Sequence, residues 1–169
     1  AQFWQPDRVQ AFFDAVPSER MLVLDLNCEE RPTWSKTQGF YGKPWVWSFL
    51  YNYGNRPILG SLGPLERFND LADVRRHPLG HNVRGVGLMM EGYGHSPLIL
   101  DLMFEMAWRD QVELKSWVQE FARFRYGKEN ADAQAAWETL RTKCYNHGTD
   151  TGHNGATIVT ALPAVGRSY

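Results

Sequence analysis

Apolar residues recur at helical spacing in some segments of the chain and form short, nearly unbroken runs in others. Over residues 7–16 they share one helical face and a proline flanks each end, which predicts an amphipathic helix. The run MLVLDL at 21–26 is nearly all apolar and has the length of a strand, as expected for a parallel strand covered on both faces. The runs WVWSFL at 45–50 and VRGVGLMM at 83–90 predict a second and a third strand.

Helical patterns follow the second and third predicted strands, and each begins at a proline. They cover 64–75 and 97–109, and proline suits the first turn of a helix. This order of strand, loop and helix is typical of right-handed βα units, in which functional side chains lie on loops at the carboxyl ends of the strands. We therefore expect the loops at 27–44, 51–63 and 91–95 to lie on one face.

From residue 113 onward the pattern contains helices without strands. The helical segments 113–127 and 130–145 precede a tail rich in Gly, Thr and Asn. The pattern therefore indicates about three βα units of a sheet or barrel, followed by the beginning of a helical region. The 169 residues fall short of the roughly 250 of a complete eight-stranded α/β barrel. Since the sequence also starts at Ala1 without an initiator Met, we expect each of its two ends to lie within a larger folded structure.

Charge and hydropathy exclude several classes of partner. The net charge is −1, from 18 basic and 19 acidic residues without a Lys/Arg stripe, so we expect no nucleic acid partner. No apolar run approaches the roughly 18 to 20 residues that span a bilayer, so we expect no membrane insertion. Cys28 and Cys144 are too few and too far apart for a disulfide framework, and we expect Cys28 to be a buried thiol.

Acidic residues follow the predicted strands at the positions where βα units carry function. Glu29 and Glu30 come after the first strand, and Glu91 comes directly after the third, beside glycines that let backbone approach closely. Glycoside hydrolysis needs two carboxyl groups about 5 to 5.5 Å apart for retention, or about 6.5 to 9.5 Å apart for inversion. Spacing alone leaves Glu29 or Glu30 open as the partner of Glu91, and a solvated surface position is the alternative for each single acid.

Aromatic residues in or beside these loops supply flat faces that suit a sugar ring. Trp45 and Trp47 lie on the same face of a predicted strand, so they are equally well explained as core. The aromatic residues concerned are Trp34, Trp45, Trp47, Tyr51, Tyr53 and Tyr93.

The histidines suggest no metal site. His77 and His81 are four residues apart, but Pro78 and Gly80 interrupt the helix that a zinc motif needs. His153 lies in a Gly-rich loop from which it is able to reach a neighbouring site as a hydrogen-bond donor, although a surface position explains it equally well. No phosphate-binding or nucleophile-elbow motif is present in the sequence.

At these loops the chain resembles the alpha-N-acetylglucosaminidase family of glycosidases, which includes the lysosomal enzyme of heparan sulfate breakdown. Several motifs in matching order carry the resemblance nearly from end to end, which makes it more specific than any single pattern. They are Leu22-Val23-Leu24-Asp25-Leu26, Gly42-Lys43-Pro44-Trp45-Val46-Trp47, Asn52-Tyr53-Gly54, Glu91-Gly92, Trp108-Arg109, Arg125-Tyr126-Gly127 and Gly152-His153-Asn154.

The resemblance implies an α/β fold and a retaining hydrolase that removes terminal alpha-linked N-acetylglucosamine. Residues 1–110 would be the carboxyl-terminal part of a (β/α)8 TIM barrel, and residues 111–169 the start of an all-α domain. The matching positions give Glu91 as the nucleophile and the following as residues of the sugar pocket: Leu26, Trp47, Leu50, Tyr53 and His153.

The resemblance also implies that the general acid/base is a second glutamate on an earlier barrel strand, before Ala1. It leaves Glu29 as a supporting or structural acid. No metal or organic cofactor is needed. The expected partners are a glycan with terminal N-acetylglucosamine and the remainder of the catalytic barrel, in a lysosomal, secreted or periplasmic setting. The alternative function is a non-catalytic glycan-binding or interaction module that lacks the general acid.

Overall fold

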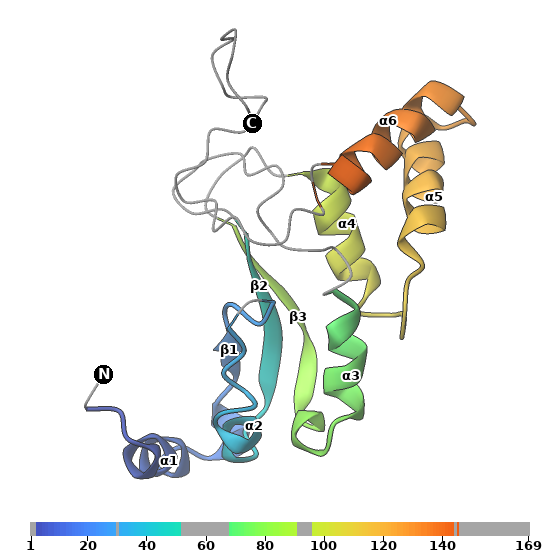
Figure 1. Ribbon diagram of the computed structural model, residues 1–169. Helices are drawn as coiled ribbons and strands as arrows, with labels where there is room; N and C mark the ends of the chain where they lie inside the picture. The colour runs from blue at the N-terminus through green and yellow to red at the C-terminus, as the bar shows by residue number, and fades with distance from the viewer. Residues whose placement is uncertain (1–2, 30, 52–67, 91–95, 144, 146–169) are drawn as a thin grey trace, which may run out of the picture. The chain divides into compact units, whose positions relative to one another are not determined.

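The structure is a computed structural model that describes residues 3–29, 31–51, 68–90, 96–143 and 145 (Figure 1). The chain forms two compact units. The first contains Ala1–Tyr51, Arg67–Met90 and Asp101–Val112, and the second contains Asn52–Glu66, Glu91–Leu100 and Glu113–Tyr169. Helix α4 (Pro97–Glu105) begins in the second unit and ends in the first. Among the described residues, no helix is both long enough and apolar enough to cross a membrane.

A parallel sheet of three strands forms the centre of the first unit (Figure 1). Strand β2 (Trp45–Tyr51) lies between β1 (Val23–Asp25) and β3 (Val83–Met90), and it runs parallel to both. The chain order of the strands is also their order in the sheet. The strands predicted at 45–50 and 83–90 are therefore confirmed.

Strand β1 is shorter and more exposed than its sequence predicts. The apolar run at 21–26 contains only three strand residues, and Leu22, Leu24 and Leu26 are 56%, 48% and 47% exposed. The expectation of cover on both faces is wrong for this strand. Among the described strands β1 pairs only with β2, and the described residues leave its leucine face uncovered.

The described helices follow the predicted order, with shifted boundaries. The expected helix at 97–109 begins at Pro97 as predicted but ends at Glu105, and the described part of the 64–75 helix begins at Asp70. The α-helices other than α4 are α1 (Pro6–Asp14), α2 (Gln38–Tyr41), α3 (Asp70–Arg76), α5 (Leu114–Tyr126) and α6 (Ala131–Lys143), and the 3-10 helices are η1 (Ser18–Arg20) and η3 (Pro78–Gly80).

The core of the first unit lies along β2. Trp45, Trp47 and Phe49 occupy every second position of the strand, so their side chains lie on the same face, and each is at most 2% exposed. The rings of Trp47 and Phe49 lie 6.3 and 5.0 Å from the ring of Phe68, just before α3. The interpretation of Trp45 and Trp47 as core residues is confirmed.

The loop at 27–44 contains a left-handed turn that the sequence pattern does not predict. This turn is the segment α2: the backbone φ is positive from Gln38 to Gly42, with values of 50° to 82°, so α2 is not a regular right-handed helix. Thr37 begins the turn by accepting a hydrogen bond from the amide of Phe40 at 3.3 Å. Left-handed backbone is unfavourable for residues with a Cβ, so this turn depends on the packing around it.

Helices α5 and α6 form an antiparallel pair in the second unit (Figure 1). Trp117 and Phe121 stack along α5, and the ring of Phe121 meets Trp137 of α6 edge-on at 5.0 Å. Helix α5 ends at Tyr126 and is capped by Gly127, whose φ of 70° is the left-handed conformation in which glycine commonly terminates a helix. Tyr145 is 2% exposed, and its hydroxyl lies 2.6 Å from the Ser96 hydroxyl.

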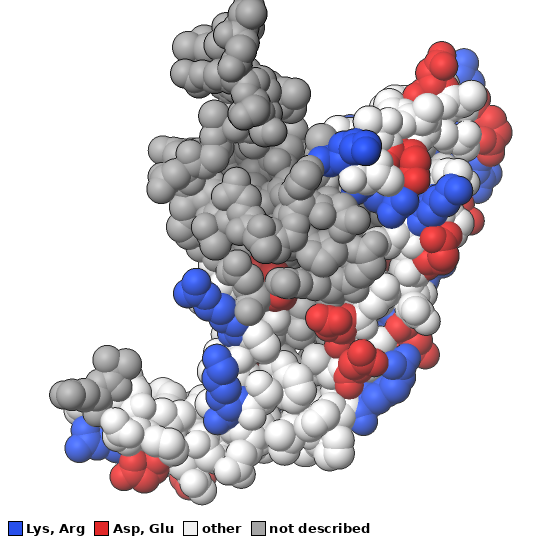
Figure 2. Space-filling view, viewed as in Figure 1, with Lys and Arg blue, Asp and Glu red and all other residues white. Residues whose placement is uncertain are grey.

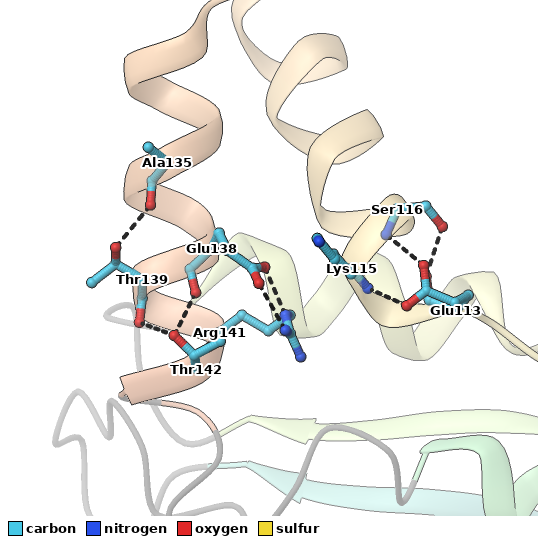
Figure 3. Close-up of polar contacts among 8 residues, drawn as sticks. All are labelled: Glu113, Lys115, Ser116, Ala135, Glu138, Thr139, Arg141 and Thr142. Carbon is cyan, nitrogen blue, oxygen red and sulfur yellow. Dashed lines mark hydrogen bonds and ion pairs between the residues drawn. The ribbon is translucent and has the colours of Figure 1, made fainter.

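Two glutamates form hydrogen bonds at the surface of this helical pair. Glu113 caps the start of α5 by accepting hydrogen bonds from the amides of Lys115 and Ser116, and Glu138 forms a two-pronged pair with Arg141 (Figure 3). On the face shown in Figure 2, acidic and basic side chains alternate over α5 and α6. The described residues of this pair therefore present a mixed surface on that face rather than a stripe of one sign.

Candidate functional site

The carboxyl ends of β2 and β3 lie level with each other. Leu50 pairs with Met89, and Tyr51 pairs with Met90, the last residue of β3. Glu91 is the next residue in the sequence, and its own position lies outside the described residues. Functional groups of parallel βα proteins gather at this edge of the sheet, so the edge is the candidate site.

Asp25 organises the loop that leaves β1. It is 4% exposed, and its Oδ2 accepts hydrogen bonds from the backbone amides of Thr33 and Trp34 at 2.8 and 2.9 Å. These charge-assisted bonds fix where the loop turns back toward β2. The signal in the sequence is a carboxylate that interrupts an otherwise apolar run.

Cys28 and Glu29 continue the contact with β2 after β1 has ended. The amide of Cys28 donates to the carbonyl of Ser48 at 3.0 Å, and Oε1 of Glu29 accepts from the amide of Leu50 at 3.2 Å. The sequence pattern does not reveal the Glu29 contact, because its two residues are 21 positions apart and no periodic signal links them.

The Cys28 side chain is unsuited to nucleophilic chemistry. Burial raises the pKa of its thiol far above the ordinary value, and the charge of Asp25 together with a hydrogen bond to Asp25 raises it further. The thiol is therefore protonated at neutral pH, and the expectation of a buried thiol is confirmed.

The structure describes Leu26, Trp47 and Leu50 among the predicted pocket residues. Leu26 directly follows β1 and is 47% exposed, Leu50 is half-buried near the end of β2, and Trp47 is buried against Phe68. The remaining site predictions lie outside the described residues: Tyr53, Glu91 and His153, together with the alternative acid Glu30 and the aromatic Tyr93.

Trp34 lies away from the carboxyl edge of the sheet. Its ring stacks on Trp45, the first residue of β2, at 5.9 Å and 12°, and it meets the ring of His77 at 5.2 Å. Trp34 therefore belongs to the aromatic packing at the amino end of β2 rather than to the candidate site.

His77 and His81 bond to backbone atoms of the turn between them. Nδ1 of His77 accepts from the amide of Leu79, and Nδ1 of His81 lies 2.7 Å from the carbonyl of Pro78. Within the described part of the chain, no cluster of His, Cys, Asp and Glu has the arrangement of a metal site.

Comparison with known families decides the relationship of the chain. The model of the alpha-N-acetylglucosaminidase TIM-barrel domain matches residues 1–110, and the model of the C-terminal domain of the same family matches residues 117–169. The chain belongs to the alpha-N-acetylglucosaminidase family. The resemblance found in the sequence motifs is thereby confirmed.

Individual members of the alpha-N-acetylglucosaminidase family agree with this assignment. The chain is 38% identical over 162 residues to the alpha-N-acetylglucosaminidase of Homo sapiens, a match that covers 94% of this chain and 22% of the human protein. The chain thus spans about a fifth of the length of this relative.

Solved family 89 glycoside hydrolases of Clostridium perfringens share the fold. One, in complex with 2-acetamido-1,2-dideoxynojirmycin, has a TM-score of 0.72 and 25% identity, over 97% of this chain and 18% of that chain. Another carries two Glu→Gln substitutions and holds its substrate GlcNAc-alpha-1,4-galactose, with a TM-score of 0.68 and 26% identity over 86% and 16%. The predicted α/β class with a parallel sheet is confirmed.

Proposed function

We propose that the chain carries the nucleophile-bearing portion of a retaining glycoside hydrolase that removes terminal alpha-linked N-acetylglucosamine from glycans. The observation that carries the proposal is the pairing of Tyr51 with Met90 at the carboxyl edge of the parallel sheet. The acid that follows Met90 in the sequence is Glu91. In a family of alpha-N-acetylglucosaminidases, an acid at the carboxyl end of a barrel strand is a natural catalytic group.

The proposed chemistry is a double displacement. The Glu91 carboxylate attacks the anomeric carbon while the bond to the leaving oxygen breaks, and that oxygen takes a proton from a second carboxylic acid. Water then attacks the glycosyl ester, loses a proton to the second carboxylate, and releases the Glu91 carboxylate. We assign the second acid to a glutamate on another strand of the same barrel.

A relative supports the use of two acids. The Clostridium perfringens enzyme was solved with its substrate in a variant that has two glutamates replaced by glutamine. Intact substrate in such a variant fits a reaction that needs two ionisable carboxyl groups. General acid catalysis alone contributes about 10² to 10⁴-fold, so both acids are required for full activity.

The proposed pocket residues come from the family resemblance. Leu26 and Leu50, at the ends of neighbouring strands, would provide apolar contacts to the sugar. Tyr53 and His153 are the other residues that we propose to contact it. Trp47 is buried, so its contribution would be to support the strand beneath the pocket. The ligand is a glycan that ends in N-acetylglucosamine, as in the substrate bound by the solved relative.

The domain division is part of the proposal. Residues 1–110 would be the carboxyl-terminal part of a (β/α)8 barrel, and residues 111–169 would begin the all-α domain. The sheet order β1-β2-β3 supports the first assignment because successive strands of such a barrel are neighbours. The α5–α6 pair supports the second.

Replacement of the nucleophile tests the proposal. Glu91→Gln, made in the complete gene product that carries this chain, should lower kcat for an aryl alpha-N-acetylglucosaminide at least about 1,000-fold. Early proton NMR spectra of the wild-type reaction should show the alpha anomer of the released sugar first, as retention requires.

A matched control separates chemistry from general damage. Glu120 is an exposed carboxylate on α5, and Glu120→Gln should leave kcat within about 2-fold of wild type. Turnover of Glu91→Gln within a few-fold of wild type would contradict the assignment of the nucleophile. Binding of N-acetylglucosamine without any turnover by the wild-type protein would favour the glycan-binding alternative.

A further inference from the structure

Strand β2 extends beyond the point where its neighbour β1 ends. The last pair between them joins Asp25 to Trp47, whereas β2 continues to Tyr51. Residues of a parallel strand direct their amide and carbonyl alternately to the two neighbouring strands. Ser48 faces the β1 side, since its carbonyl accepts from the amide of Cys28, and Leu50 therefore faces the same side two residues later.

The Glu29 side chain occupies the place where a strand carbonyl would lie. Its Oε1 accepts the amide hydrogen of Leu50 at 3.2 Å, in a half-buried position. A backbone amide that is shielded from water and lacks an acceptor is unfavourable, so this contact stabilises the extended form of β2 beyond the end of β1. The Glu29 carboxylate thus provides the hydrogen-bond acceptor that a backbone carbonyl would provide if β1 were longer.

The contact lies at the level of the candidate site. On its other side Leu50 pairs with Met89, two residues before Glu91 in the sequence. Leu50 is also one of the proposed pocket residues. Any shift of β2 at Leu50 would therefore reach both a wall of the pocket and the strand that leads to the proposed nucleophile.

We infer that Glu29 is a positioning residue for the proposed hydrolase, which holds the carboxyl end of β2 by accepting the Leu50 amide. This inference rests on the proposed function for its kinetic consequence. The role requires a hydrogen-bond acceptor at the right distance and requires neither negative charge nor proton transfer. It therefore differs from the role of a second catalytic acid, which spacing in the sequence leaves open for Glu29.

Two substitutions separate the effect of the length of the Glu29 side chain from the effect of its charge. Glu29→Gln keeps the length of the side chain and a carbonyl acceptor for Leu50, whereas Glu29→Asp keeps the charge but is one methylene shorter. Glu29→Ala removes both properties. Glu19, an exposed acid in η1, provides the control Glu19→Ala in the same unit.

Kinetics and amide exchange are measured together in the complete gene product. Glu29→Gln should keep kcat within about 3-fold of wild type, while Glu29→Ala and Glu29→Asp should lose about 10- to 100-fold in kcat, with KM changed less than about 3-fold. The Leu50 amide should exchange with deuterium at least about 10-fold faster in Glu29→Ala and Glu29→Asp, and at nearly the wild-type rate in Glu29→Gln.

Two results for the Glu29 variants would overturn the inference. A Glu29→Gln enzyme as impaired as Glu29→Ala, with Leu50 still protected, would show that Glu29 acts through its charge or its proton. Unchanged Leu50 exchange in Glu29→Asp would show that the contact does not hold the strand, even if Glu29→Ala fails to fold. Absence of turnover in the wild-type protein would contradict the proposed function instead, and the exchange series would still decide the role of Glu29.

Discussion

The left-handed turn before β2 makes a specific prediction for Gly39. This residue has a φ of +66°, and a Cβ built on it would lie 2.3 Å from the backbone carbonyl oxygen of Leu79. Left-handed backbone costs a residue with a Cβ about 1 to 2 kcal/mol. Overpacking against a backbone atom adds about 1 to 3 kcal/mol. Gly39→Ala should therefore lower the free energy of unfolding by about 2 to 5 kcal/mol.

Three other glycines separate the two contributions. Gly42 has a φ of +82° with its nearest contact at 3.9 Å, so Gly42→Ala should show the backbone cost alone, about 1 to 2 kcal/mol. Gly80 lacks a positive φ, but its Cβ would lie 1.7 Å from the carbonyl oxygen of Val74, so Gly80→Ala should show the steric cost. Gly85 has neither feature, and Gly85→Ala should be neutral or stabilising by less than about 1 kcal/mol.

Thermal unfolding of the complete gene product measures the series. Gly39→Ala should lower Tm more than Gly42→Ala does, because its expected loss of unfolding free energy is larger. Gly42→Ala should lie between Gly39→Ala and Gly85→Ala. Equal Tm values for Gly39→Ala and Gly42→Ala would refute the close approach to Leu79, and no loss in Gly42→Ala would refute the left-handed turn.

Further predictions concern charged groups. The hydrogen bond from Arg141 holds the pKa of Glu138 below its ordinary value of 4.5. The stability that this pair contributes is therefore present above pH 4.5 and is lost as the pH falls through the lowered pKa. Glu138→Gln should make the free energy of urea unfolding fall less between about pH 6 and pH 3. Arg75 donates to the carbonyls of Ala107 and Arg109, so Arg75→Ala should cost about 1 to 3 kcal/mol in urea unfolding, and full rescue by Arg75→Lys would contradict this two-carbonyl role. Asp25→Asn should lower the raised pKa of Cys28 and speed its labelling by maleimide at alkaline pH; an unchanged rate would argue against that coupling.

Local signals predicted much of this fold. The start of α4 at Pro97 and the end of α5 at Gly127 each depend on the backbone preference of one residue, which the sequence displays directly. Strand β2 was predictable from its apolar run because a parallel strand with a neighbour on each side is buried, and β3 was predictable from its own largely apolar run although it lies at an edge of the described sheet. The same reasoning overestimated the cover of β1 among the described residues, since apolar composition does not reveal which elements pack over a strand.

Other features depend on contacts that no sequence period encodes. The left-handed turn includes Gln38, Phe40 and Tyr41, whose side chains give no sign of positive φ. The Glu29 contact with Leu50 requires knowledge of how far β2 extends beyond β1, which follows only from the sheet register. Family motifs identified the proposed nucleophile, Glu91, whereas the support of the adjacent strand became visible in the structure.

Trapping the covalent intermediate tests the proposed role of Glu91 most directly. The complete gene product is treated with an N-acetylglucosaminyl fluoride that carries a second fluorine on the ring, which slows hydrolysis of the glycosyl ester. Peptide mass mapping should then locate one glycosyl group on Glu91. A glycosyl group on Glu29 instead, or turnover that releases the beta anomer without any adduct, would contradict the account.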